Sequence, residues 1–217
     1  LTLIRLYGET LQRKKNLTEE DRNESYEIIT KESERLSHLI NNVLDFSRID
    51  MGRKEFKFRN DSLSRVVQET LDSYRYHLEK KGFKVFDEID SNLPETSFDA
   101  EAVASILVNL LSNAMKFSSD MKEATVRLFR RDRWAVLQVE DTGIGIPRQE
   151  QGEIFKRFYR VKQGAASQTQ GSGLGLTLVK HIAEAHGGAV EVESEPGKGS
   201  VFSILLPLSR PDEAEAK

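Results

Sequence analysis

One change in the spacing of apolar residues, near residue 55, limits what this chain can fold into more than any other feature. Before it, apolar residues from Tyr26 to Ile49 recur at spacings of three, four or seven, and residues 1–15 follow a similar helical pattern. Thr18 precedes three acidic residues, which is typical of a helix start, because the hydroxyl caps the backbone and the acids face the positive end of the helix dipole. The sequence therefore predicts a helical hairpin over residues 1–51.

A hairpin of two helices cannot bury both of its apolar stripes by itself. One solution is a homodimer through residues 1–51, in which two hairpins form a four-helix bundle. The other is packing of the hairpin on the rest of its own chain. We favour the homodimer.

Strand-like and helical runs alternate after residue 55. Strands are predicted at residues 56–59, 83–89, 124–129, 134–140, 189–193 and 200–206, and helices at residues 62–80, 99–117 and 174–186. This order predicts an α+β fold with a mixed sheet covered by helices on one face. The small and polar residues 163–170 are predicted to form a mobile loop, and residues 209–217 a disordered tail.

Charge and composition exclude several classes of protein. The chain has 32 Lys and Arg against 35 Asp and Glu, a formal charge of −3, which argues against a nucleic-acid partner held by bulk positive potential. It has no cysteine, which excludes thiolate catalysis and cysteine-ligated zinc and favours an intracellular location. No apolar run approaches the roughly 20 residues of a membrane span, so no membrane contact by these residues is expected. Because the first residues already follow a helical pattern, we expect the chain to be a fragment of a longer protein.

The run VNLLSNAMKF at residues 108–117 has two opposite characters. In a helix, Asn109, Asn113 and Lys116 fall within one narrow stripe, while leucines occupy the opposite flank. One face packs, and the other presents two amides and an ammonium group. An ordinary amphipathic helix with a solvated face would have the same pattern, so the interpretation depends on the segments that follow.

Two glycine-containing segments favour a ligand. In VEDTGIGIP, Asp141 ends a strand at an inward-facing position and needs a hydrogen-bond donor, such as the exocyclic amine of adenine or, alternatively, a backbone turn. Gly143 and Gly145 remove side chains where a ligand could approach the backbone. In GSGLGLTL, alternating glycines run into a helix whose N-terminal N–H groups are suited to phosphate.

Taken in order, NLLSNAMKF, DTGIGIP, IFKRFYR and GSGLGLTLVKHIAEAHGG resemble the N, G1, F and G2 boxes of bacterial sensor histidine kinases, a branch of the GHKL ATPase superfamily. SERLSHLINNVLDFSRID resembles the second helix of their dimerisation and phosphoacceptor hairpin. The resemblance implies an α+β two-layer sandwich (the Bergerat or GHKL fold), preceded by the helical hairpin. The expected domains are a dimerisation hairpin over residues 1–51, a catalytic ATP-binding domain over 52–208 and a tail over 209–217.

The resemblance implies ATP and Mg²⁺ as cofactors, and it assigns roles to polar residues. Asn113 is implied as the Mg²⁺ ligand, because an amide oxygen is hard enough for this ion. Asn109 would share that site or orient water in it. Lys116 is implied as a phosphate contact, and Arg160 as a contact to the terminal phosphate.

The remaining roles concern the base and the phosphate loop. Asp141 is implied as the adenine selector, assisted by the hydroxyl of Ser200, with Phe117 beside the nucleoside. Gly143 and Gly145 would flank the base. The full set of implied nucleotide-binding residues is Asn109, Asn113, Lys116, Phe117, Asp141, Gly143, Gly145, Ile146, Arg160, Gly171, Gly173, Leu174, Gly175 and Ser200.

The reaction implied by the resemblance is transfer of the γ-phosphoryl group of ATP to a histidine, followed by relay to an aspartate on the receiver domain of a response regulator. ATPases of the superfamily place a glutamate base at the position of Asn109, and an asparagine cannot act as that base. The family's phosphoacceptor histidine is expected six positions before Leu1, and His38 lacks the surrounding motif, so this chain alone is not expected to label itself.

Two alternatives stay open: a nucleotide-gated binding module that signals by conformation alone, and a GHKL ATPase. The resemblance also implies a cytoplasmic kinase core, with an inner-membrane anchor as an option for the full-length protein.

Overall fold

The computed structural model describes residues 2–13, 17–50, 55–118, 121–161 and 172–208. The chain divides into two compact units, Leu1–Lys54 and Glu55–Lys217. The predicted mobile loop at 163–170, the predicted tail at 209–217 and Gly171 lie outside the described residues.

The first unit consists of the two helices α1 (Thr2–Arg13) and α2 (Glu19–Asp50). Thr18 caps α2 as predicted, since its Oγ1 accepts the Asp21 N–H at 3.1 Å and donates to the Asp21 carboxylate at 2.8 Å. Helix α1 buries none of its residues, and Leu3 and Leu6 are 45% and 55% exposed. The apolar stripe of α1 is therefore only partly covered.

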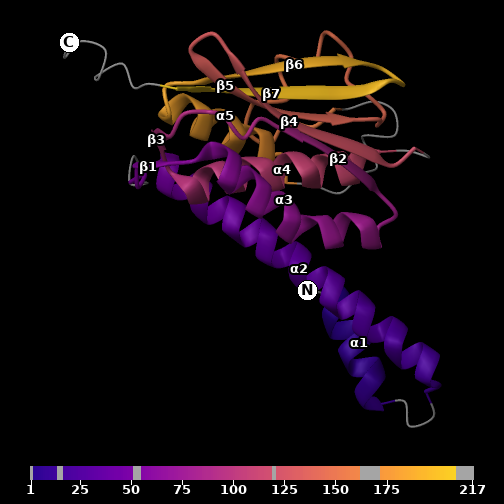
Figure 1. The fold of residues 1–217 in the computed structure, drawn as a ribbon. Coiled ribbons are helices and arrows are strands. Elements are labelled where there is room, and N and C mark those ends of the chain that lie inside the picture. Colours follow the sequence, from indigo (N-terminus) through magenta and orange to yellow (C-terminus); the bar gives the residue numbers. More distant parts are fainter. Residues whose placement is uncertain (1, 14–16, 51–54, 119–120, 162–171, 209–217) are drawn as a thin grey trace. The chain divides into compact units, whose positions relative to one another are not determined.

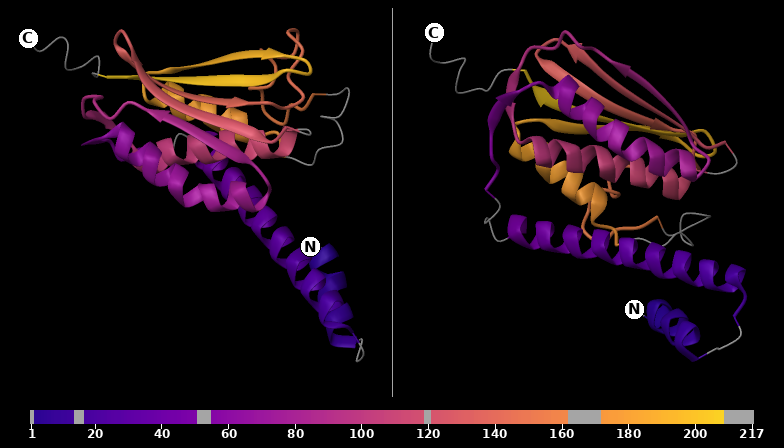
Figure 2. Two further views of the ribbon diagram at one scale, coloured as in Figure 1. Left: turned by 45° about the vertical axis from the view of Figure 1, so that its right-hand side comes forward. Right: turned by 60° about the horizontal axis from the view of Figure 1, so that its bottom comes forward.

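The second unit is built on a five-stranded sheet in the order β2-β4-β5-β7-β6. These strands are β2 (Lys84–Ile89), β4 (Glu123–Arg131), β5 (Trp134–Asp141), β7 (Gly199–Pro207) and β6 (Ala189–Glu195). Strand β2 runs parallel to β4, and the other pairs are antiparallel, so the sheet is mixed. Helices α3 (Leu63–Lys80), α4 (Ala100–Phe117) and α5 (Gly175–Ala185) lie on one face of this sheet (Figures 1 and 2). The predicted α+β two-layer sandwich is confirmed.

The alternation of β5 decides which of its side chains face the helices. Ala135, Leu137 and Val139 are at most 1% exposed, and Asp141 follows them at the same parity. On the helix side, α4 contributes buried leucines such as Leu110 and Leu111, each worth about 1.5–3 kcal/mol of burial. The same pattern that forms the core thus holds the Asp141 carboxyl in the layer between sheet and helices.

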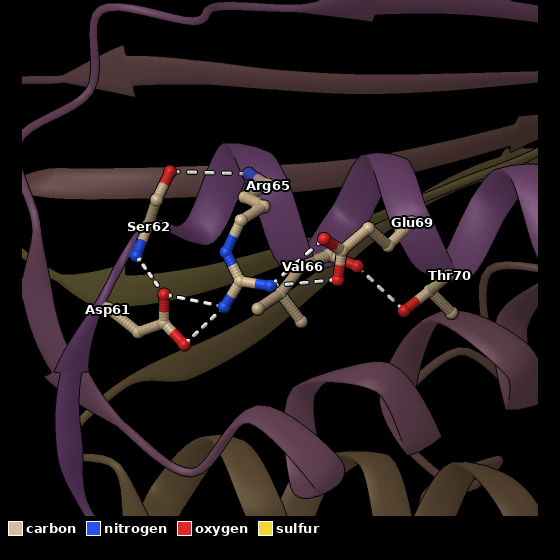
Figure 3. Close-up of polar contacts among 6 residues, drawn as sticks. All are labelled: Asp61, Ser62, Arg65, Val66, Glu69 and Thr70. Carbon is tan, nitrogen blue, oxygen red and sulfur yellow. Dashed lines mark hydrogen bonds and ion pairs between the residues drawn. The ribbon is translucent and has the colours of Figure 1, made fainter.

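A local network fixes the start of α3 (Figure 3). Ser62 Oγ accepts the Arg65 N–H at 3.2 Å, and the Arg65 guanidinium bridges Asp61 at 2.6 Å and Glu69 at 2.8 Å. The hydrogen bond from Arg65 lowers the pKa of the Asp61 carboxyl. Contacts among residues close in sequence therefore stabilise the start of α3.

The strand predicted at Phe56–Arg59 is wrong. The strand β1 lies at Arg59–Asp61 and pairs with β3 (Thr96–Phe98), a three-residue strand that was not predicted. Instead of alternating across a sheet, the rings of Phe56 and Phe58 pack on the His186 ring, with centroids 5.4 Å and 4.8 Å away. Packing on a distant residue overrides the local strand pattern here.

His186 joins three segments of the second unit. It is the C-cap of α5 and is 6% exposed, and its Nδ1 donates to the Ile182 carbonyl at 2.8 Å. Its Nε2 accepts the Asp99 N–H at 3.0 Å, and the Asp99 carboxylate caps α4 at Ala102 and accepts the Lys57 N–H at 2.8 Å. The end of α5, the start of α4 and residues 56–58 are therefore fastened together.

Candidate functional site

Helix α4 carries the polar stripe expected from the sequence. Asn109 and Asn113 are half-buried, and the Asn109 Nδ2 donates to the Ser105 carbonyl at 2.9 Å. Lys116 lies in the last turn of α4 and is exposed, yet partial desolvation of its ammonium lowers the pKa of Lys116. Two amides and a cation thus share one face of α4.

The start of α5 meets this stripe. A Cβ placed on Gly175, the first residue of α5, would lie 2.9 Å from the Oδ1 of Asn109. Glycine at this position lets the helix start approach the amide, and any side chain would displace it. The structure therefore brings together Asn109 and Gly175, which are 66 positions apart in the sequence.

Helix α5 also differs from its neighbours at its N-terminus. Ser62 and Asp99 cap α3 and α4 with side-chain hydrogen bonds, whereas the N-cap Leu174 makes none and is itself buried. Among the described residues, no side chain caps the first N–H groups of α5, which can therefore donate to an anion.

Asp141 lies at the other end of the site. It is 8% exposed, and burial raises the pKa of its carboxyl to about 6, although hydrogen bonds from the backbone N–H groups of Gly143 and Ser200 act in the opposite direction. The Gly143 N–H donates to Asp141 Oδ1 at 2.8 Å. At neutral pH the carboxylate is therefore ionised, positioned by backbone donors, and able to accept one more hydrogen bond.

The loop after Asp141 packs tightly on the protein itself. A Cβ on Gly143 would lie 2.6 Å from the Asp141 carboxylate and 2.6 Å from the Phe117 carbonyl. Gly145 has a φ of +67°, and a Cβ there would lie 2.0 Å from the Glu195 carbonyl. The two glycines therefore have a packing reason that the sequence did not reveal, in addition to their expected place beside the base.

The same loop is tied to the end of α4. The Ile144 N–H donates to the Phe117 carbonyl at 2.9 Å, and Ser118 forms an isolated antiparallel bridge with Gly143. Phe117 and Lys116 are thereby held near the loop that follows Asp141. The last turn of α4 connects the amide stripe to the acidic end of the site.

The F box and the glycines before α5 contact each other through the backbone. The Phe158 N–H donates to the Gly173 carbonyl at 3.1 Å, and a Cβ on Gly173 would lie 2.7 Å from the Phe158 carbonyl carbon. Tyr159 donates to Glu150 at 3.0 Å, and Arg160 follows as an exposed residue. The segment that ends in Arg160 is therefore anchored beside the start of α5.

Two further residues of this region were missed by sequence reasoning. Ser194 Oγ accepts the Ile146 N–H at 2.8 Å, and Gln151 Nε2 donates to the carbonyls of Ile146 at 3.0 Å and Ser194 at 2.8 Å. The Ser200 hydroxyl lies 2.9 Å from Ser194 Oγ and forms a hydrogen bond with it, whereas the backbone N–H of Ser200 donates to the Asp141 carboxyl. A usable signal existed for Ser194, which follows Val190 and Val192 at the same inward parity of its strand.

The described residues contain no group of three or more His, Asp or Glu side chains that could hold a metal ion. Among those same residues, no helix is long and apolar enough to cross a membrane.

Comparison with known protein families gives two matches. A family described as "Histidine kinase-, DNA gyrase B-, and HSP90-like ATPase" matches residues 98–210. A family described as "His Kinase A (phospho-acceptor) domain" matches residues 1–52. The two matches fall on the two compact units.

Curated relatives agree with these families. The circadian input-output histidine kinase CikA of Synechococcus elongatus is 37% identical over 193 residues, which cover 88% of this chain and 26% of that protein. The non-motile and phage-resistance protein of Caulobacter vibrioides is 38% identical over 180 residues, covering 81% of this chain and 21% of that protein. This chain therefore spans about a quarter of the length of these relatives.

Solved structures are similar over almost the whole chain. Full-length ShkA in complex with AMPPNP has a TM-score of 0.72 at 26% identity, covering 95% of this chain and 43% of that one. The histidine kinase AdeS of Acinetobacter baumannii has a TM-score of 0.71 at 19% identity, covering 95% of this chain and 94% of that one, and it shows likeness of fold alone.

Proposed function

The chain belongs to the sensor histidine kinases of the GHKL superfamily, and from this we propose that it is the kinase core of a two-component sensor. In this proposal it binds Mg-ATP and transfers the γ-phosphoryl group to a histidine upstream of Leu1. The supporting observation is that one helix, α4, links the buried acceptor Asp141 to the uncapped start of α5. The former is suited to the adenine amine and the latter to phosphate.

The nucleotide would be held at both of these ends. Ionised Asp141 would accept a hydrogen bond from the exocyclic amine of adenine, with Phe117 and Ile146 beside the base. The N–H groups at the start of α5 would donate to the phosphates, with Gly173, Leu174 and Gly175 shaping that end. Lys116 and Arg160 would add positive charge to the phosphate end.

Asn113 would be the Mg²⁺ ligand and Asn109 would share or orient that site. The ion would neutralise charge on the phosphate oxygens during transfer. An ion held by amides would rely on phosphate oxygens and water for its other ligands.

Transfer needs no general base in this site. A neutral imidazole nitrogen attacks the γ-phosphorus, the bond to the bridging oxygen breaks, and ADP leaves. Asn109 cannot take a proton from water, which favours an acceptor that is itself nucleophilic over hydrolysis. The family match does not favour the alternatives of a nucleotide-gated module or an ATPase.

The partners belong to the same proposal. Residues 1–51 would form a homodimer that covers the exposed leucines of α1, and a receiver domain of a response regulator would take the phosphoryl group from the histidine. We place this core in the cytoplasm, where both ATP and the response regulator are present.

The test uses γ-labelled Mg-ATP on a chain extended upstream to include the expected histidine, with residues 1–217 alone beside it. The expected result is an acid-labile, alkali-stable label on the extended chain only. A histidine-to-glutamine variant of the extended chain is the control and should stay unlabelled. If the extended chain binds ATP but takes no label, the transfer is refuted and nucleotide-gated signalling replaces it.

A further inference from the structure

The hydroxyl of Ser194 has a complete set of hydrogen bonds. Its Oγ donates to the Gly199 carbonyl at 2.8 Å and accepts the Ile146 N–H at 2.8 Å. The third contact is with Ser200 Oγ at 2.9 Å, where either oxygen could be the donor by distance alone. A serine hydroxyl has one hydrogen to donate and two lone pairs to accept with.

This count decides the direction of the Ser194–Ser200 bond. The Gly199 carbonyl can only accept, so the one hydrogen of Ser194 is used there. The bond between the two serines then requires the Ser200 hydroxyl to donate. Because its one hydrogen is used in this bond, Ser200 Oγ can only accept further hydrogen bonds.

Ser200 stands next to the acid that is expected to bind the base. Ser200 and Asp141 are paired residues of adjacent strands, both are buried at 6% and 8% exposed, and the Ser200 N–H bonds the Asp141 carboxyl. Two acceptors therefore lie side by side at this end of the site, one ionised and one held in its orientation by Ser194.

We propose that Ser194 is a specificity-determining positioning residue, which orients the Ser200 hydroxyl as an acceptor beside Asp141 so that the site favours a 6-aminopurine over a 6-oxopurine nucleotide. The inference rests on the proposed function, because it deepens the adenine recognition assigned to Asp141. A 6-amino group donates hydrogen bonds, either directly or through a water that it holds, whereas a 6-oxo group only accepts. A fixed acceptor therefore penalises the 6-oxo group.

Gln151 provides an internal comparison. Its side-chain amide donates to the carbonyls of Ile146 and Ser194 and so holds the same loop on the same strand. These bonds do not involve the Ser194 or Ser200 hydroxyl, so they do not affect which serine donates to the other. Loss of Gln151 should loosen the loop for every nucleotide alike. Loss of the Ser194 hydroxyl should instead free Ser200 to rotate and donate, so that a 6-oxo group is tolerated better.

The experiment measures the dissociation constants of Mg-ATP and Mg-ITP by calorimetry on residues 1–217 and its variants. Wild type is expected to prefer ATP. Ser194→Ala should lower the ITP-to-ATP ratio of dissociation constants by about 3- to 10-fold, the effect of one mismatched hydrogen bond. Ser194→Thr keeps the hydroxyl and should keep the wild-type ratio. Gln151→Ala should weaken the binding of both nucleotides without changing the ratio. Ser203→Ala should leave both dissociation constants unchanged. Ser203 is the matched control because its hydroxyl pairs with Gln138 on the opposite face of the sheet.

A double-mutant cycle checks that Ser194 acts through Ser200. In a Ser200→Ala background, Ser194→Ala should leave the ratio unchanged. An unchanged ratio in the single Ser194→Ala variant overturns the inference, as does an equal change in Gln151→Ala. Failure of the proposed function looks different, because then wild type itself would bind neither nucleotide or show no preference for ATP.

Discussion

Asp141 is the residue on which recognition of the base depends most in the proposed site. Its carboxyl is buried and bonded by two backbone N–H groups, which leaves it an acceptor for a donor on the ligand. We predict that Asp141→Asn weakens ATP binding by at least about 1–3 kcal/mol, because an amide nitrogen presented to the base amine leaves a buried donor unsatisfied. Isothermal calorimetry measures this directly.

Glu140 is the matched control for that variant. It is the neighbouring acid, but it faces the other side of the sheet, where it is paired with Arg127. Glu140→Gln should bind ATP like wild type. Equal affinity of wild type and Asp141→Asn would remove the adenine assignment.

The raised pKa of Asp141 gives a pH dependence with a definite sign. Burial raises the pKa to about 6, so the carboxyl is mostly protonated at pH 5 and mostly ionised at pH 7. The ionised form is the acceptor, and we predict that ATP affinity rises about tenfold from pH 5 to pH 7 through this group. Titrations across this range should show the rise in wild type. Asp141→Asn should lose the rise that is due to this carboxyl and keep any change that is due to titration of ATP itself. Identical pH profiles of ATP affinity in wild type and Asp141→Asn would contradict the prediction.

At the scale of elements, a substitution at the contact between α4 and α5 is expected to change nucleotide binding without lowering the stability of the fold. The Cβ of Gly175→Ala would meet only the end of the Asn109 side chain, which can rotate away, and alanine gains up to about 1 kcal/mol of helix propensity over glycine. We predict that this variant unfolds at the same or a higher temperature but loses Mg²⁺-dependent ATP affinity, because the Asn109 amide is displaced.

Thermal unfolding and calorimetry with and without Mg²⁺ test both halves of this prediction. Gly152→Ala is the control, since a Cβ there meets nothing within 4 Å. A Gly175→Ala variant with wild-type affinity in Mg²⁺ would show that the Asn109 position is not required.

Periodicity located the long elements well and the short ones badly. The predicted helix at residues 62–80 differs from the observed α3 by one residue, because an 18-residue amphipathic pattern is unambiguous. The strands β1 and β3 have three residues each, too few to show alternation, and they depend on pairing with each other. Elements of this kind are set by tertiary contacts.

The same limit applies to the candidate site. The inward direction of Asp141 was predictable from the alternation of its own strand, and its burial confirms that direction. The contact of Gly175 with Asn109 and the bond of Ile146 to Ser194 join segments that are distant in sequence, so no local pattern contains them. The roles of these residues in nucleotide binding stay predictions until the variants are measured.

At the scale of the whole molecule, the two compact units are expected to have separate functions, with dimerisation in the first and ATP binding in the second. We predict that residues 1–217 form a dimer and that residues 55–217 alone are monomeric and still bind ATP, because α1 leaves Leu3 and Leu6 exposed while the second unit has its own core. Sedimentation and calorimetry on both chains measure this. A monomeric full chain at micromolar concentration would remove residues 1–51 from the dimer assignment.

Through His186, helix α5 connects residues 56–58 to the candidate site. One end of this 11-residue helix is the uncapped start beside Asn109, and the other is the His186 cap on which Phe56 and Phe58 rest. A rigid helix of that length spans about 16 Å. We infer that a force applied to the chain at residue 55 would act through this helix on the end proposed to bind the phosphates, without any need for unfolding.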